Sequence, residues 1–137
     1  MKFINKLLLI MSFLSTSVSA ANDVYGTVDE LYIRSGGDDD SYLAFRINVL
    51  NDISIFESCV IDWNNLVWKV DVSSPVSKYQ YDIIKESYTN KLPIRIIGQH
   101  KLCDKGNVYS DKVYELSPWI WDYHLKEEDL SSRDNGN

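Results

Sequence analysis

The 137-residue chain has little of what most enzymes and metal sites need. It contains two cysteines without a Cys-x-x-Cys spacing, and its two histidines, His100 and His124, do not fall into a zinc-ligand pattern. No serine lies in a nucleophile-elbow pattern, no glycine-rich phosphate loop is present, and the carboxylate pair Glu127 and Glu128 lies in a charged tail. The sequence therefore predicts a protein that is not an enzyme and that needs neither a metal nor a cofactor.

Long apolar runs are absent except at the N-terminus. Lys2 and Lys6 form a short basic region, residues 7–14 are apolar with one serine, and residues 17–20 end on small side chains. This is the pattern of a secretory signal peptide, and the apolar run is too short to span a bilayer as a helix. We predict a signal peptide over residues 1–20, a secreted or periplasmic location and no membrane span. A membrane-anchoring N-terminal helix is the alternative.

Basic residues are also scarce, at 14 against 20 acidic ones. Loss of Lys2 and Lys6 with the signal peptide would leave 12 basic residues and a net charge of −8. Such a chain repels nucleic acid and anionic lipid, so no nucleic-acid partner is expected.

The two cysteines, Cys59 and Cys103, both belong to the part expected to be exported. Exported proteins meet an oxidising environment, so we predict a disulfide between them. In the chain-entropy view this bond is worth about 4 kcal/mol. Two free thiols or a metal pair remain the alternative.

Alternating apolar residues predict two strands that form a hairpin. Over residues 24–33 the apolar parity switches midway, which indicates a β-bulge at Asp29 and Glu30, while residues 43–49 alternate without a break. The stretch between them, SGGDDDS at residues 35–41, is rich in glycine and aspartate and lacks the ligand spacing of an EF-hand. It predicts a solvated hairpin tip rather than a calcium loop.

The remaining elements are expected in the order strand, helix, strand, strand. We predict them over residues 66–72, 77–90, 94–97 and 113–116. Ser77 is the expected N-cap of the helix, and Trp119 and Trp121, which share strand parity, would extend one aromatic face of the last strand. Residues 126–137 should form a disordered charged tail.

The resulting order, β-β-β-α-β-β, is that of the OB-fold, a five-stranded Greek-key barrel. The predicted fold is therefore mostly β: a small OB-fold-like barrel over residues 21–125, with one helix between the third and fourth strands. An open antiparallel sheet with a packed helix is an alternative. A lipocalin-like barrel is another, although it needs more strands than this chain has.

The segment over residues 79–96, YQYDIIKESYTNKLPIRI, carries a family resemblance. It resembles the helix-to-strand passage of the B subunits of subtilase cytotoxin and typhoid toxin, which belong to AB5-type toxins. Those subunits also have a signal peptide, an OB-fold and a Tyr-rich helix, and their first strand has a glycine at the place of Gly26. The resemblance implies a homopentamer that binds sialylated glycans and delivers a toxic A subunit.

Two departures argue against carrying over the sialic-acid site of that family. Tyr25 stands where the family has its binding serine, and Gly98 stands where a tyrosine of the fourth strand contributes. The resemblance thus implies the fold and a partner class, but no glycan-contacting residue.

The strongest functional lead in the sequence is a tryptophan in a polar turn. Trp63 has Asp62 and Asn64 beside it, and an exposed indole flanked by hydrogen-bonding groups suits a sugar or a peptide. These three residues are the predicted ligand-binding set, and an indole folded back onto the barrel is the alternative. The predicted function is a secreted binding module that recognises a glycan or a host surface. The alternative is a secreted or periplasmic module that binds a protein.

Overall fold

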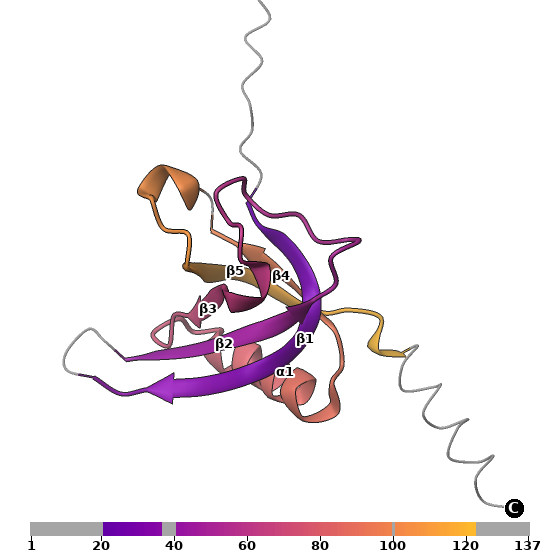
Figure 1. Cartoon of the computed structure of the whole chain (residues 1–137). Helices are drawn as coiled ribbons and strands as arrows, with labels where there is room; N and C mark the ends of the chain where they lie inside the picture. The colour runs from indigo at the N-terminus through magenta and orange to yellow at the C-terminus, as the bar shows by residue number, and fades with distance from the viewer. Residues whose placement is uncertain (1–20, 37–40, 100, 123–137) are drawn as a thin grey trace, which may run out of the picture.

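The computed structural model describes residues 21–36, 41–99 and 101–122, which form a closed five-stranded barrel with one α-helix (Figure 1). The elements are β1 (Asp23–Arg34), β2 (Tyr42–Val49), the 3-10 turn η1 (Trp63–Asn65), β3 (Val67–Val70), α1 (Ser77–Asn90), β4 (Ile94–Gly98), the 3-10 turn η2 (Cys103–Lys105) and β5 (Ser110–Pro118). The predicted fold class is confirmed. The predicted signal peptide, the centre of the predicted hairpin tip, both histidines and the predicted charged tail lie outside the described residues.

The barrel closes in the strand order β1-β2-β3-β5-β4. All neighbouring strands are antiparallel except β3 and β5, which run parallel. In Figure 1, α1 lies at one end of the barrel, while the connection between β2 and β3 and the turn η2 lie at the other end. No described helix has the length and apolar character needed to cross a membrane.

Strand β1 is long because it pairs with two neighbours. Residues 23–26 pair with β4 and residues 26–34 pair with β2. The register with β2 shifts between Val28 and Glu30, which confirms the predicted bulge. Gly26 is required at the crossing of the two pairings, because a Cβ there would lie 2.3 Å from the carbonyl oxygen of Asn48.

The barrel interior is filled by large side chains that alternate along the strands. The largest fully buried side chains are Trp68, Phe45, Ile47, Ile94 and Ile96 on the strands, together with Leu66 just before β3 and Ile84 on α1. Helix α1 covers one end of this core with Ile84 and Ser87. The Ser87 hydroxyl accepts the backbone N–H of Val28 at 3.0 Å, and Lys91 Nζ donates to the Val28 carbonyl at 3.0 Å. Ser87 of α1 and Lys91, the residue that follows the helix, therefore bind both backbone polar groups of Val28, just before the bulge.

The predicted N-cap is wrong, although the helix spans the predicted residues. Ser77 is the first helical residue, and Val76 occupies the N-cap position without a side-chain bond. The preceding residues already form a turn, in which the Ser77 N–H donates to the Ser74 carbonyl. From this position the Ser77 hydroxyl reaches back to the Val72 carbonyl rather than forward to the helix amides.

The prediction that the last strand continues through the tryptophans is also wrong. Strand β5 ends at Pro118, and Ile120 has a φ of 48°, in the left-handed region, so the chain turns there. The backbone N–H of Trp119 and the indole N–H of Trp121 both donate to the Pro93 carbonyl, at 3.0 and 2.6 Å. The Trp119 backbone and the Trp121 side chain thus both bind the Pro93 carbonyl, while the Trp119 ring packs against Tyr25.

Candidate functional site

The connection between β2 and β3 carries Trp63, which is both anchored and exposed. The indole stacks on the ring of Phe56, with centroids 5.2 Å apart and planes 3° from parallel. Its Nε1–H donates to the Val60 carbonyl at 3.0 Å, and the residue is 40% exposed. The structure therefore combines the two sequence-based alternatives: one ring face is covered by Phe56, while much of the remaining indole faces solvent.

The two polar neighbours of Trp63 hold the turn. Asp62 accepts a bond from the side-chain amide of Asn65 at 2.8 Å, and the side-chain oxygen of Asn64 accepts the backbone N–H of Val49 at 3.2 Å. These bonds fix η1 against the end of β2. Of the three residues predicted to bind a ligand, Trp63 is thus the one that presents a broad contact surface.

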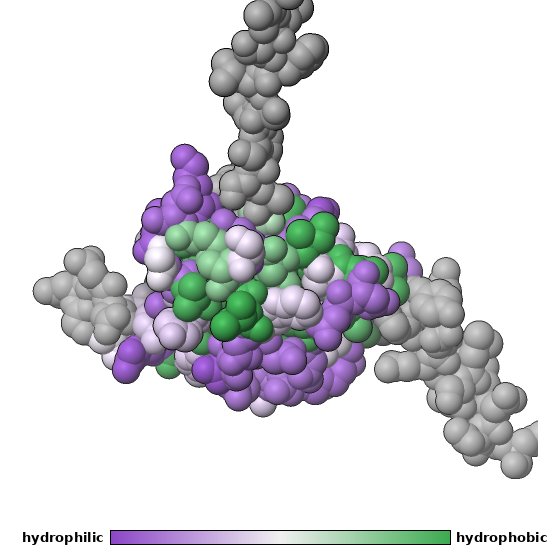
Figure 2. All heavy atoms as spheres, turned by 45° about the horizontal axis from the view of Figure 1, so that its top comes forward, coloured by the Kyte–Doolittle hydropathy of each residue, from purple (hydrophilic) through white to green (hydrophobic). Residues whose placement is uncertain are grey.

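Sequence reasoning missed the surroundings of this indole. A shallow hollow of about 360 Å³ lies beside it, lined by Ser54, Phe56, Glu57, Ser58, Val60, Ile61 and Trp63. Ile61 is 87% exposed and Ile55, nearby in the chain, is 60% exposed. Figure 2 turns this end of the barrel toward the reader and shows apolar side chains gathered there beside polar ones. We call Phe56, Ile61, Trp63 and the adjoining hollow the Trp63 surface.

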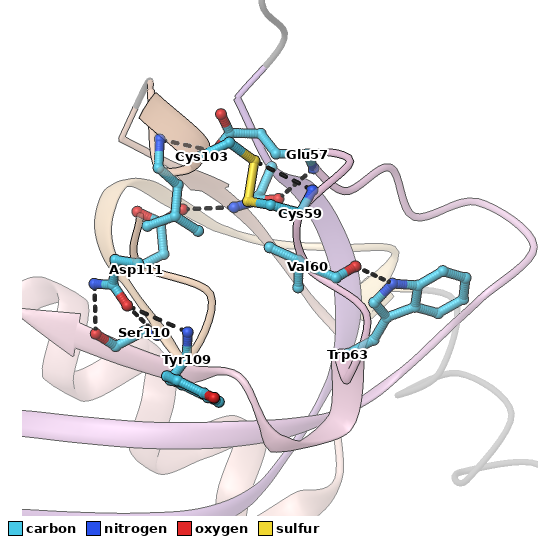
Figure 3. The surroundings of a disulfide bond; sticks show 11 residues. Glu57, Cys59, Val60, Trp63, Cys103, Tyr109, Ser110 and Asp111 are labelled. Carbon is cyan, nitrogen blue, oxygen red and sulfur yellow. Dashed lines mark hydrogen bonds between the residues drawn. A yellow bond between two sulfur atoms is a disulfide. The ribbon is translucent and has the colours of Figure 1, made fainter. Parts of the chain in front are cut away.

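The loop that carries the Trp63 surface is tied down at several points. The predicted disulfide is confirmed, with Cys59 bonded to Cys103 of η2, and the Cys59 N–H also donates to the Cys103 sulfur at 3.2 Å. A buried Glu57 carboxylate accepts the N–H of Leu102 at 3.2 Å. Figure 3 shows these contacts, with Trp63 on one side of the disulfide and Asp111 on the other. A surface held this way loses little conformational freedom on binding.

A buried polar cluster lies on the other side of the disulfide. The side-chain amide of Asn22 donates to the Asp111 carboxylate at 2.8 Å, and the Asn22 side-chain oxygen accepts the N–H of Glu57 at 2.7 Å. The other Asp111 oxygen accepts the backbone N–H groups of Gln99 and Lys112. This cluster joins β1, β4, β5 and the β2–β3 connection at one end of the barrel.

Burial raises the pKa of the Asp111 carboxyl above its ordinary value. The negative charge of Glu57 adds to this rise, whereas the bonds from Asn22, Lys112 and Gln99 oppose it. Buried carboxyls with raised pKa values occur at catalytic sites, but both oxygens of this one are engaged by structural donors. We therefore assign Asp111 to the architecture of the barrel.

Gly98 is explained by the same cluster. A Cβ at this position would lie 1.9 Å from the Asp111 carboxylate oxygen and 3.3 Å from the Trp68 ring. A side chain as large as tyrosine at this place would displace the buried carboxylate. The structure thus gives a physical reason for glycine at position 98.

Tyr25 packs in a separate cluster of aromatic and charged side chains. Its ring meets Trp119 edge-on with centroids 5.1 Å apart, and the Arg95 guanidinium lies 5.7 Å from the ring centroid. Arg95 also forms a two-bond ion pair with Asp23 at 2.7 and 2.9 Å, which raises the pKa of the arginine further above its ordinary value. Aromatic and charged side chains therefore fill the place where the resemblance would put a binding serine.

Comparison of the chain with protein-family models, with curated proteins and with solved structures gives no match. Within residues 21–36, 41–99 and 101–122, no three His, Cys, Asp or Glu side chains come together as metal ligands.

Proposed function

We propose that the chain is a secreted, non-enzymatic binding module that recognises a glycan or a host surface through the Trp63 surface. The observation that supports this most is that the Trp63 indole is held by stacking on Phe56 and by its bond to the Val60 carbonyl, yet the residue remains 40% exposed. An indole with one free face gives the apolar contact that a sugar ring needs, and the hollow beside it has polar Ser54, Glu57 and Ser58 along its wall.

The test is a glycan array probed with the mature protein, followed by fluorescence titration of any glycan that binds. Trp63→Ala should abolish binding, because it removes the platform and leaves the loop held by the disulfide. Tyr79→Ala is the matched control, since Tyr79 is 69% exposed and lies on α1 at the other end of the barrel. A non-sulfated glycan whose binding survives Trp63→Ala, or an array on which no non-sulfated glycan binds, would contradict the proposal.

A protein partner is the second candidate, and one specific observation favours it. Ile61 and Ile55 are 87% and 60% exposed, and aliphatic side chains beside an indole suit a protein interface better than a sugar. Ile61→Ser separates the two candidates. It should leave a glycan platform nearly intact, but it should weaken binding to a protein strongly.

Assembly into a homo-oligomer, with a pentamer as the leading form, is part of this proposal through the resemblance to toxin B subunits. Two strand edges of the described chain support it. Strand β1 pairs with β4 only up to Gly26, and β5 pairs with β3 only up to Lys112. The free stretches carry Ile33, which is 68% exposed, and Tyr114, which is 70% exposed. Pairing of one edge with the other in a neighbouring copy would be a heterologous contact of the kind that closes rings.

Light scattering on the mature protein at micromolar concentration tests the assembly. A mass of several subunits, lost when Tyr114→Lys places a charge on the β5 edge, is the expected result. The mass of a single subunit, unchanged on concentrating, would remove the ring from the proposal and leave a monomeric binding module.

A further inference from the structure

Two adjoining hollows lie where β3 and β5 meet. The larger has a volume of about 370 Å³, and Lys69, Gln99, Lys105 and Lys112 are among its lining residues. The smaller, of about 290 Å³, is lined by Tyr42 and again by Lys69 and Lys112. Because the same two lysines line both hollows, we treat them as one lysine groove. Its combined size is in the range of about 300–1,000 Å³ that small-molecule sites occupy.

The two central lysines of the groove stand directly opposite each other. Lys69 of β3 and Lys112 of β5 are partners in the parallel register. Like charges at partner positions of neighbouring strands repel each other, so the approach of these two lysines to each other does not stabilise the barrel. The placement is also unexpected in a chain whose net charge is −6. A cost of this kind is typical of a binding site, where stability is lost in favour of function.

Nearby carboxylates only partly neutralise these lysines. The two ion pairs of the described residues, Arg46 with Glu30 and Arg95 with Asp23, involve none of the groove lysines. Asp71 lines the smaller hollow, and its pKa is lowered, first by its bonds from Ser73 and in smaller part by the charge of Lys112.

The buried Asp111 also lines the larger hollow, but its carboxylate is engaged by Asn22 and by two backbone amides. Asp71 is therefore the carboxylate within reach of the groove cations, and positive charge prevails along the groove.

Further cations extend this charge in both directions. Lys105 of η2 adds a third ammonium group to the larger hollow. At the smaller hollow, Lys69 Nζ lies 4.9 Å and the Arg34 guanidinium 5.8 Å from the centroid of the Tyr42 ring. An anionic ligand with several charged groups spaced along its length would meet one cation after another.

We infer that the lysine groove binds a sulfated oligosaccharide. Compact, rotatable ammonium groups suit a tetrahedral sulfate, whereas a planar carboxylate is matched best by the two-pronged guanidinium of arginine. The polar side chains of Gln99 and Ser41 lie along the groove, where sugar hydroxyls would meet them.

Nucleic acid fits the groove less well. The Tyr42 ring already has the Lys69 ammonium 4.9 Å from its centroid, and the Arg34 guanidinium donates to its hydroxyl at 3.2 Å, so a base would have to compete with these cations for the ring. The acidity of the whole chain also repels a long polyanion, as the sequence already indicated.

This inference does not depend on the Trp63 surface, and calorimetric titration of the mature protein at low salt separates the two. A heparin-derived tetrasaccharide should bind, and its fully desulfated form should not. The double variant K69Q/K112Q should weaken binding at least tenfold. The control variant K78Q/K85Q removes the same charge from α1, whose lysines line neither hollow, and it should bind as the unchanged protein does. Trp63→Ala should also leave binding unchanged.

Thermal unfolding supplies a second readout. Because K69Q/K112Q removes a like-charged cross-strand pair, its melting temperature should stay the same or rise, so lost binding cannot be ascribed to misfolding. The inference is overturned if the tetrasaccharide does not bind, or if K78Q/K85Q weakens binding as much as the groove variant. Tighter binding of a single-stranded oligonucleotide of equal charge would assign the groove to nucleic acid instead, and binding of inorganic sulfate alone with equal strength would remove the saccharide.

Discussion

Replacing Gly98 by alanine should destabilise the barrel through one contact, with the carboxylate of Asp111. The added Cβ would lie 1.9 Å from that oxygen, so the carboxylate must move by about 1 Å before the contact reaches 3.0 Å. Gly98 does not have a left-handed backbone, so alanine brings no backbone strain of its own. The cost therefore measures what the Asp111 cluster contributes.

The magnitude follows from the bonds that the displaced carboxylate loses. The side-chain amide of Asn22 is fully buried and would be left without its acceptor, which costs about 1–3 kcal/mol. The bonds from the backbone amides of Gln99 and Lys112 would weaken as well, so we expect a total loss of about 3 kcal/mol in the free energy of unfolding.

A double-mutant cycle isolates this contact. Asp111→Ala destabilises the barrel, but it also removes the atom that Gly98→Ala would strike. In the Asp111→Ala background the nearest remaining neighbour of the new Cβ is the Trp68 ring at 3.3 Å, so Gly98→Ala should then cost less than about 1 kcal/mol. Urea unfolding followed by circular dichroism measures all four proteins. An equal cost of Gly98→Ala in both backgrounds would refute the reasoning.

Three further predictions concern the same barrel. Replacing Cys59 and Cys103 by serine should lower the free energy of unfolding by about 4 kcal/mol in a urea titration, and a loss below about 1 kcal/mol would contradict a stabilising bond. Ser87→Ala should cost about 1–3 kcal/mol because it leaves a buried β1 amide without an acceptor, while the exposed Ser58→Ala should stay within about 0.5 kcal/mol. Burial raises the pKa of Asp111, so the folded chain holds the proton of this carboxyl more tightly than the unfolded chain does. The protonated carboxyl therefore stabilises the fold fully below pH 3.8, and this stabilisation is lost as the pH rises through the raised pKa. The destabilisation caused by Asp111→Ala should therefore be largest at low pH, and a difference that stays constant up to pH 7 would exclude this linkage.

Much of the barrel could be predicted because its signals are local. The switch in apolar parity around Asp29 gave the bulge, and the presence of only two cysteines left one pairing to consider. The start of β5 could not be read in this way. Ser110, Asp111 and Lys112 lack apolar alternation, and they form a strand only because β3 offers them a parallel partner.

The two candidate sites also differ in whether their sequence signals are local. The exposure of Trp63 could be expected from its polar neighbours, but the stacking on Phe56 depends on how the loop folds back. The lysine groove has no local signal at all, because Lys69 and Lys112 lie far apart in the sequence and meet only when β3 pairs with β5. Sites made by barrel closure are therefore the ones that a reading of the sequence misses.

The closed topology also sets an order for folding. The ribosome delivers β1 first, and β1 can pair with β2 at once, but Gly26 must wait for Ile94 before its other edge is covered. Pairings between residues this distant in the chain are slow to form, on a scale of about milliseconds to seconds in β-rich domains. The beginning of β1 is therefore synthesised first but gains its β4 partner late. Until β4 has been synthesised and pairs with it, this part of β1 remains an open strand edge to which a chaperone or a second nascent chain can bind.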